Sequence, residues 1–442
     1  MNKLDLLSDL VSRARRAGAD AADAILVAGA SLSVSRRGGQ TEQLERSEGQ
    51  DLGLRVFLGQ QIAVVSATSI DPASFDRLVE RALAMARVVP ADGFAGLAET
   101  MAPPEMLDLE LDDGQEPEAE ALIARAQAAE EAARSIAGVT NTEGGDAGFS
   151  RSEVALVTSA GFAAVQARSS HSVSAVALAG QGVGMQRDYD YTSTVHLSDL
   201  EDAATIGRRA GERAVQRLNP IRPKTGTYNV LFDPRVAGSL LGSVSAAVNG
   251  AAVARGTSLF KDRMGQRIFA PGINIIDDPR RVRGLRSKAW DGEGTPTRRL
   301  AIIEDGVLQS WLLDSRSARQ LKLTSTGHAS RGTGGPPSPS ATNLYLAPGP
   351  LTPAELMADI AEGIYVTELL GGGMNGVTGD YSRGAAGFMI RNGQLAEPVA
   401  EITIAGHGMD MFARLVPAND LVFRRGTDSP TIRIDGLTVA GA

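Results

Sequence analysis

Cysteine is absent from the 442 residues of this chain. Its absence excludes disulfides, cysteine-ligated iron–sulfur clusters, zinc sites built on thiolates, and cysteine nucleophiles. Histidine is nearly as scarce, with residues only at positions 171, 196, 328 and 407, and no HExxH motif occurs. A catalytic metal held by histidine would therefore need ligands gathered from distant parts of the chain.

An excess of basic residues is also missing. The chain has 44 lysines and arginines against 52 acidic residues, which gives a net charge of −8. Nonspecific binding of nucleic acid needs a basic surface that displaces counterions, so this balance disfavours that function. With 43% hydrophobic and 22% charged residues, the composition is typical of a soluble folded protein of two or three domains.

Segments typical of membrane spans or export signals are lacking as well. Residues 236–254 are uncharged, but their glycines, serines and Asn249 favour a buried, closely packed helix over a membrane span. Asp5 and Asp9 stand where a signal peptide would be apolar. We therefore expect a cytoplasmic protein that does not enter the membrane.

Common nucleotide-binding and hydrolase motifs are missing too. The chain contains neither a GxxxxGK[ST] phosphate loop nor a GxSxG nucleophile motif. Residues 180–184 (GQGVG) have the glycine spacing of a dinucleotide loop. They join two predicted strands, however, and no helix follows to supply the N-terminus that binds phosphate. We expect a turn there.

The first half of the chain predicts helices and strands in a repeated order. Apolar residues at helical spacing predict a helix over residues 3–17, and Asp71-Pro72 predicts the start of another. Between them, alternation predicts strands at 24–28, 31–36 and 40–47, and a hairpin over 52–64. The order of helix, strands and helix recurs between residues 117 and 218, which suggests an internal duplication.

The second half predicts a different architecture. Prolines 220 and 223 predict a boundary between an N-terminal domain, residues 1–219, and a C-terminal domain, residues 225–442. After a small-residue helix at 235–254, many short strands separated by turn dipeptides predict a barrel or a sandwich. The fold class is thus α+β: an N-terminal α/β domain and a β-rich C-terminal domain that buries the small-residue helix.

Two segments of the C-terminal half are candidates for function. Residues 327–341 form a loop rich in glycine, proline and serine, and a loop that long in a compact domain is either functional or disordered. The candidate segment is Thr324–Arg331, which leads into this loop. Residues 371–384 hold too many glycines for an ordinary core strand. The residues alone leave two interpretations open, a channel for a peptide or partner and a set of tight β-turns.

Several segments together resemble one known family. Residues 376–388 (GVTGDYSRGAAGF) and 397–406 carry the most specific similarity, and residues 242–256 and 325–328 agree with it. The chain is similar to the TldD/PmbA family over nearly its whole length, and it most resembles the PmbA branch, also called TldE. The family also bears the label modulator of DNA gyrase, but the acidic composition gives no support to DNA binding.

The resemblance implies a cytoplasmic protease for peptides and small unfolded proteins, built from two related subunits. The TldD-type subunit carries HExxxH on a helix of its C-terminal domain, and a later cysteine completes its zinc site. In the present chain the corresponding slots fall on Gly242, Ser243 and Ala247, which cannot act as strong zinc ligands or as a general base. Small residues there suggest that a neighbouring element packs closely against the helix.

The resemblance therefore implies a subunit without its own metal, catalytic residues or cofactor, paired with a TldD-type paralogue that holds the zinc. Whether this chain has activity alone is left open. Candidate contacts for peptide or partner are His328, Gly373, Asp380, Tyr381 and Arg383. One alternative is a peptidase with a nonstandard metal site around His328, His407 and Asp380. Another is a homodimer that acts as a peptide-binding or scaffold protein.

Overall fold

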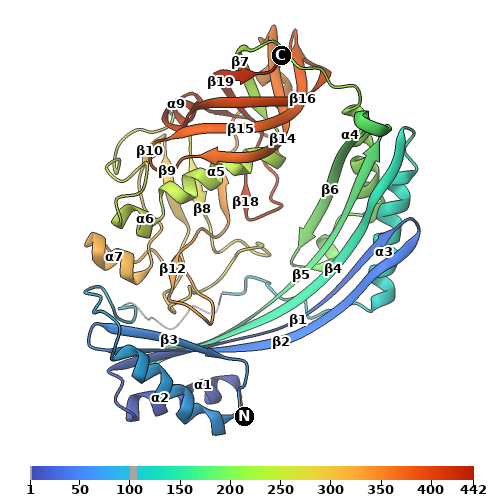
Figure 1. Cartoon of the computed structure of the whole chain (residues 1–442). Coiled ribbons are helices and arrows are strands. Elements are labelled where there is room, and N and C mark those ends of the chain that lie inside the picture. Colours follow the sequence, from blue (N-terminus) through green and yellow to red (C-terminus); the bar gives the residue numbers. More distant parts are fainter. Residues whose placement is uncertain (1, 100–106) are drawn as a thin grey trace.

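The computed structural model describes residues 2–99 and 107–442. In the first half, the described strands form one six-stranded antiparallel sheet in the order β3-β2-β1-β4-β5-β6 (Figure 1). Its strands are β1 (Ala21–Arg37), β2 (Gln40–Leu58), β3 (Gln61–Ala67), β4 (Val139–Thr158), β5 (Ala163–Ala179) and β6 (Gln186–Thr194). Strands β1, β2, β4 and β5 are long and curved, and they form an arch that bends around the second half of the chain (Figure 1).

The long strands are more continuous than the sequence predicts. The predicted strands at 24–28 and 31–36 are one strand, β1, and the strands predicted within residues 40–58 are likewise one strand, β2. Gly29 and Gly49 interrupt the apolar alternation, but they lie directly opposite each other in the ladder. Backbone hydrogen bonds to neighbouring strands therefore continue each strand across residues that the apolar alternation did not predict to be in a strand.

Four helices cover one face of this sheet. They are α1 (Lys3–Arg16), α2 (Phe75–Ala86), α3 (Ala119–Arg134) and α4 (Ala203–Gln216), with short 3₁₀ turns η1 (Pro72–Ser74), η2 (Gly182–Gly184) and η3 (Leu197–Asp199). Helices α1 and α2 pack over one end of the sheet, and α3 and α4 pack over the other. The order of helix, three strands and helix occurs twice, and β1 and β4 pair antiparallel at the centre.

The second half contains a closed barrel of five strands. They are β7 (Gly226–Phe232), β14 (Glu362–Met374), β15 (Asp380–Arg391), β16 (Gln394–His407) and β19 (Ile432–Ala440), and β17 (Val416–Pro417) adds to β19. Pairing of β16 with β19 closes the ring. The β-rich architecture is confirmed, and of the two predicted forms, a barrel or a sandwich, the structure has the barrel. Closure leaves no exposed sheet edge between these strands.

The second half also contains a second sheet and several helices. The sheet has the strand order β10-β9-β8-β13-β18, and the helices lie between strands in the sequence. The strands are β8 (Ile275–Asp277), β9 (Leu300–Glu304), β10 (Val307–Leu308), β13 (Leu344–Leu346) and β18 (Thr427–Asp428), with β11 (Ala329–Ser330) paired to β12 (Ser338–Pro339). The helices are α5 (Pro234–Ala247), α6 (Gly250–Ala254), α7 (Ser315–Leu321), α8 (Pro353–Met357) and α9 (Gly408–Arg414).

The helix predicted over residues 235–254 is two helices. Helix α5 ends at Ala247, and Asn249 caps α6 by accepting hydrogen bonds from the backbone N–H groups of Ala251 and Ala252. Leu240 and Leu241 of α5 are buried in the main core of the second half.

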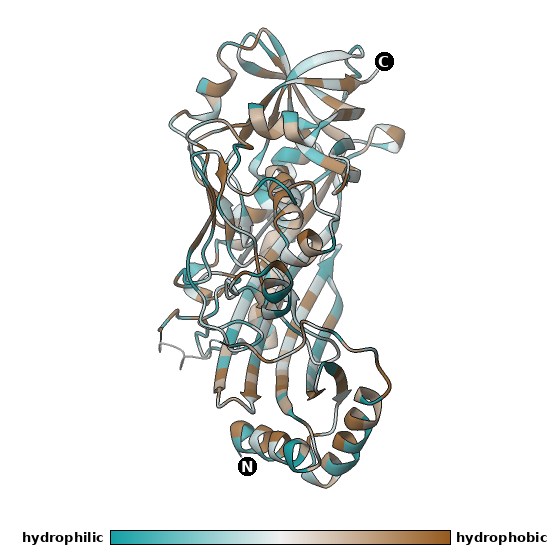
Figure 2. Cartoon of the chain, turned by 90° about the vertical axis from the view of Figure 1, so that its left-hand side faces the viewer, coloured by the Kyte–Doolittle hydropathy of each residue, from teal (hydrophilic) through white to brown (hydrophobic). Residues whose placement is uncertain are grey.

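A side view shows bands of apolar and polar residues along the long strands, as expected where a sheet buries only one face (Figure 2). None of the helices in the described ranges combines the length and apolar character needed to cross a bilayer.

Candidate functional site

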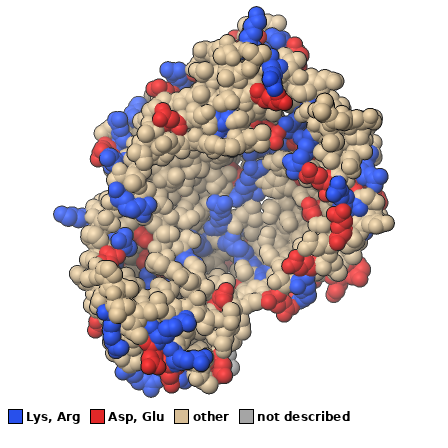
Figure 3. Space-filling model, in the orientation of Figure 1, with Lys and Arg blue, Asp and Glu red and all other residues tan. Residues whose placement is uncertain are grey.

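A hollow lies between the arch of long strands and the barrel-containing half (Figure 3). The two halves touch at both of its ends. At one end Phe162 packs edge-on against Trp290, with ring centroids 5.3 Å apart. At the other end, cavities of about 220, 250 and 360 Å³ are lined jointly by residues of β6 and of the second half. The hollow is thus bounded by both halves of the chain.

The sheet presents an array of serines toward this hollow. Ser31 of β1 lies opposite Ser47 of β2 and Ser150 of β4, and the array continues across β5 to β6. Directly opposed residues of antiparallel strands point to the same face. We call this surface the serine face; it comprises Ser31, Ser33, Ser35, Ser47, Ser150, Ser152, Ser170, Ser172, Ser174 and Ser193.

The orientation of the serine face follows from its neighbours in register. Arg168 lies opposite Ser152 in the ladder, and its guanidinium donates hydrogen bonds to the carbonyls of Leu285 and Ser287 in the second half. Leu32 and Val34, which alternate with the serines, are buried beneath α3 on the other face. The serine face is therefore the face without helices, and its hydroxyl groups offer hydrogen-bond donors and acceptors in the hollow.

Sequence reasoning missed the serine face, although a signal for it was present. Residues 31–35 read SLSVS and residues 170–174 read SHSVS, with serine on one face of each strand and a buried residue on the other. That alternation indicates a strand whose polar face carries small, uncharged side chains. Only the pairing of the strands brings the two segments into one surface.

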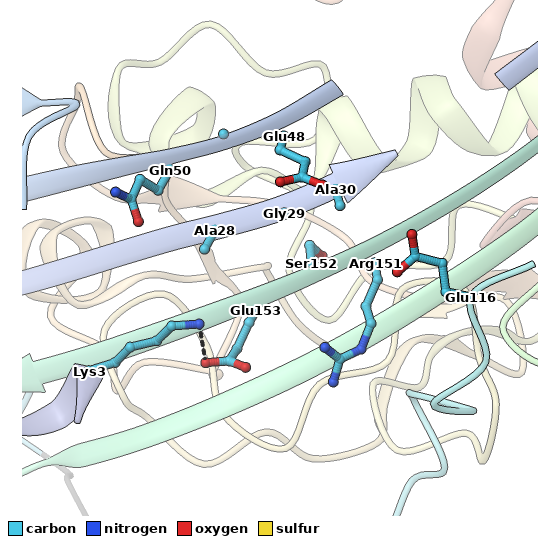
Figure 4. A pocket seen from close by; sticks show the side chains of 11 residues that line it. Lys3, Ala28, Gly29, Ala30, Glu48, Gln50, Glu116, Arg151, Ser152 and Glu153 are labelled. Carbon is cyan, nitrogen blue, oxygen red and sulfur yellow. Dashed lines mark hydrogen bonds and ion pairs between the residues drawn. The ribbon is translucent and has the colours of Figure 1, made fainter. Parts of the chain in front are cut away.

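A cavity of about 520 Å³ on the opposite face of the sheet does not belong to this site (Figure 4). It occupies the space between α1 and the residues that precede α3, above Ala28 and Ala30 of β1. Lys3 reaches across it to Glu153, with Nζ 2.6 Å from Oε1. The cavity therefore marks a gap between the two pairs of helices.

Helix α5 carries the three slots that the family resemblance assigns to the zinc motif. Gly242 is exposed, and a Cβ built there would meet no atom within 4 Å. The hydroxyl of Ser243 bonds the carbonyl of Ser239 one turn earlier, and Ala247 is buried. The predicted close packing is therefore wrong at Gly242, where the helix faces open space. It occurs instead at Gly250, where a Cβ would lie 2.7 Å from the Leu312 carbonyl oxygen.

The glycine-rich segment 371–384 is a hairpin of the barrel, formed by the end of β14 and the start of β15. Gly373 pairs with Ser382 at its exposed tip. The exposed Asp380 accepts a hydrogen bond from the Thr378 hydroxyl. Tyr381 is buried in the barrel core, and burial raises its pKa to about 12. Of the predicted contacts in this hairpin, Arg383 lines the cavity of about 220 Å³ beside β6.

His328 has no exposed surface. Its Nε2 lies 3.1 Å from Oδ1 of Asp277, and its Nδ1 lies 2.9 Å from the Thr326 carbonyl oxygen. Asp277 also accepts a hydrogen bond from the backbone N–H of Thr342. The ring therefore offers no atom to a peptide or partner, in contrast to the expectation, and it holds residues 324–331 against β8. Asp277, which is fully buried, is the centre of this cluster.

The remaining histidines have separate partners. His171 is buried with Nε2 2.8 Å from Asp113, and burial lowers its pKa. His196 bonds the Glu110 carbonyl and His407 bonds the Thr378 carbonyl. Asp380 and His407 are cross-strand neighbours, but His328 lies with Asp277. Across residues 2–99 and 107–442, no three histidine, aspartate or glutamate side chains are close enough together to hold a metal ion.

The donor set on α5 also fails to fit zinc, because Gly242 and Ala247 have no donor atom in their side chains.

Comparison with known families agrees with the resemblance in the sequence. Three models of the PmbA/TldA metallopeptidase match consecutive parts of the chain: domain 1 at residues 22–86, the central domain at 112–218 and the C-terminal domain at 225–441. The metalloprotease PmbA of Escherichia coli O157:H7 is 35% identical over 417 residues, which cover 93% of this chain and 90% of that protein. The chain belongs to the PmbA/TldD family.

Solved structures share the fold of this family member. A proposed modulator of DNA gyrase from Bacteroides thetaiotaomicron aligns with a TM-score of 0.91 and 24% identity, covering 99% of this chain and 98% of that one. TldE from Thermococcus kodakarensis aligns with a TM-score of 0.88 and 19% identity, covering 99% and 100%. A TldD homolog of Buchnera aphidicola is 24% identical over 59% of this chain and 58% of its own length. The chain thus has a protease-related role within a family that includes both TldE-like and TldD-like members.

Proposed function

We propose that this chain is the subunit of a TldD/TldE-type protease that lacks its own zinc and pairs with a TldD-type paralogue. The observation that carries the proposal is the exposed side of α5, where Gly242 and Ser243 occupy slots that the resemblance assigns to a zinc ligand and a general base. Neither residue supplies that chemistry. The zinc and the catalytic residues then belong to the partner, and we place the complex in the cytoplasm.

The hollow is the proposed path of the peptide. An extended peptide exposes one N–H and one C=O group per residue, and each must find a partner when it leaves water. The serine face supplies hydroxyl groups that both donate and accept, and its small side chains leave room for substrates of varied sequence. Such a surface holds peptides mainly through their backbone, which suits small unfolded proteins as substrates.

Reconstitution tests this function. The TldD-type paralogue of the same organism is purified, and cleavage of an unstructured peptide is measured with that subunit alone, with this chain alone and with both. We expect cleavage only from the mixture. Full activity of the paralogue by itself would refute the proposal. Cleavage by this chain alone, with zinc bound, would favour the stand-alone peptidase instead.

A blocked hollow provides the second test. Ser33 is exposed on the serine face, so Ser33→Trp fills space in the hollow without entering a core. Ser12→Trp is the matched control, because Ser12 is exposed on α1 at the far face of the sheet. We expect the first variant to reduce cleavage by the mixture and the second to leave it unchanged. Equal activity of both variants would place the peptide elsewhere.

A further inference from the structure

Basic side chains gather in the hollow, although the whole chain is acidic. Figure 3 shows lysine and arginine atoms along the interior between the barrel-containing half and the long strands. The cavities beside β6 are lined by several arginines, including Arg283 and Arg424. Both of these are neutralised, Arg283 by Asp199 at 3.0 Å and Arg424 by Glu201 at 3.1 Å. Their charges therefore add little to the net potential of the hollow.

Three other arginines in this region have no carboxylate partner among the described residues. Arg281 places its guanidinium 3.3 Å from the centre of the Phe423 ring. Arg286 donates to the Thr427 hydroxyl at 3.3 Å. Arg425 donates to the Arg235 carbonyl at 2.7 Å and lies over the Tyr191 ring of β6. Each guanidinium has more donors than these contacts use, and each keeps its full positive charge.

Apolar side chains lie among these charges. Val422 is 55% exposed, and Phe423 is 39% exposed beside Arg281. We call Arg281, Arg286 and Arg425 together with Val422 and Phe423 the arginine patch. A surface that combines exposed aromatic and aliphatic carbon with unpaired guanidiniums is suited to a ligand with alternating apolar and anionic groups.

The loop that carries the patch is held in place before any ligand arrives. The buried carboxylate of Asp428 accepts hydrogen bonds from the backbone N–H groups of Arg424, Arg425 and Gly426, at 2.9 to 3.0 Å. Phe423 also packs edge-on against Tyr345, with ring centroids 5.2 Å apart. A fixed loop costs less entropy on binding than a mobile one, so the geometry favours recognition.

We infer that the arginine patch binds carboxylate side chains of the peptide, so that this subunit selects acidic, partly apolar peptide segments for the complex. The inference rests on the proposed function and adds the class of substrate to it. Arginine pairs with carboxylates through two parallel hydrogen bonds, which lysine cannot match in geometry. Carboxylates spaced along a peptide fit separate guanidiniums. The net charge of −8 on the chain disfavours a nucleic acid as the ligand.

Equilibrium binding to this chain alone tests the inference. The probes are a fluorescent twelve-residue peptide of alternating Glu and Phe with Gly spacers, its counterpart with Gln in place of Glu, and a single-stranded RNA of twelve nucleotides. We expect the Glu peptide to bind more tightly than the Gln peptide. We expect the preference to weaken as salt rises, because the contacts are ionic.

The variant with Arg286→Gln and Arg425→Gln tests whether the arginine patch causes the preference for the Glu peptide. Loss of two charge-assisted contacts should weaken the Glu peptide by about tenfold or more and leave the Gln peptide unchanged. Arg16→Gln with Arg77→Gln is the matched control, since both residues are exposed on α1 and α2. Arg286→Lys with Arg425→Lys, which keeps the charge, should give an intermediate result. Thermal melting verifies that each variant is folded.

Three results would overturn the inference. They are equal binding of the Glu and Gln peptides, no effect of the Arg286→Gln, Arg425→Gln variant, and tighter binding of the RNA through the same two arginines. These failures differ from a failure of the proposed function, which is measured by cleavage of a neutral peptide in the reconstituted mixture. Successful reconstitution without acidic preference would refute the inference and leave the function standing.

Discussion

The guanidinium of Arg331 lies 2.7 Å from the carboxylate of Asp23, and neither side chain has any exposed surface. Asp23 belongs to β1 of the first sheet, whereas Arg331 follows β11 in the second half. Arg55 of β2 pairs with the same carboxylate. Burial by itself would raise the pKa of Asp23, but Arg331 and Arg55 lower it overall, so the carboxylate stays ionised. This buried charge cluster joins the two halves at one end of the hollow.

Asp23→Asn should therefore destabilise the protein strongly. The substitution leaves two buried guanidiniums without their shared counter-charge, and breaking a buried ion pair in this way typically costs about 3–5 kcal/mol. Urea unfolding measures the change. Asp76→Asn is the control, because the ion pair of Asp76 with Arg13 is exposed and should contribute little. Equal stability of the two variants would contradict the role assigned to the cluster.

Glu293, which lies beside Arg55, should make stability depend on pH. Burial raises the pKa of Glu293 to about 7 from an ordinary value of 4.5, despite the attraction of Arg55. The folded state therefore binds this proton more tightly than the unfolded state does. Stability from this group is fully present below about pH 4.5 and is lost as pH rises through 7. Glu293→Gln removes that dependence, so its unfolding free energy should vary less over this interval. Parallel stability curves for the two proteins would refute this prediction.

Gly53 of β2 should tolerate no side chain. A Cβ there would lie 2.8 Å from the Thr333 Cα and closer still to the Thr333 carbonyl oxygen, which belongs to the loop of the second half. Gly53→Ala should cost about 1–3 kcal/mol, because backbone atoms of one half must move away from the other. Gly49→Ala on the same strand meets nothing within 4 Å and should be nearly neutral. Thermal melting distinguishes the two, and similar melting temperatures would contradict the close approach.

Substitution of Gly242 in α5 should lower activity without lowering the stability of the protein. A larger side chain there has open space, and leucine favours the helix more than glycine does. Gly242→Leu should thus leave the melting temperature unchanged or raise it. If α5 faces the peptide, the same variant should lower cleavage by the reconstituted mixture several-fold. Gly250→Leu is the contrasting control, which should lose stability because its Cβ meets the Leu312 carbonyl. Full activity of Gly242→Leu would remove α5 from the peptide path.

Local patterns in the sequence determined much of the fold. The apolar spacing of residues 3–17 and the Asp71-Pro72 pair predict the first two helices, and the alternation around Gly59 predicts the β2–β3 hairpin. These signals are reliable because the residues that form each element are neighbours in the chain. The repeated order of helix, strands and helix was also readable. The lengths of the strands could not be predicted. Glycine and serine interrupt the apolar alternation at positions where hydrogen bonds to neighbouring strands continue the strand.

The candidate site depended on the tertiary structure. The family resemblance assigns the zinc-motif slots to Gly242, Ser243 and Ala247, and the sequence by itself shows that these residues are not strong zinc ligands. It did not show that His328 would be buried against Asp277. It also did not show that Arg281 would lie over Phe423 and Arg425 over Tyr191, with no ion pair to a carboxylate among the described residues. Those relationships join residues far apart in the chain, and periodicity carries no information on which distant faces meet. Only the packing of the two halves decided which polar groups line the hollow and which charges are left unpaired there.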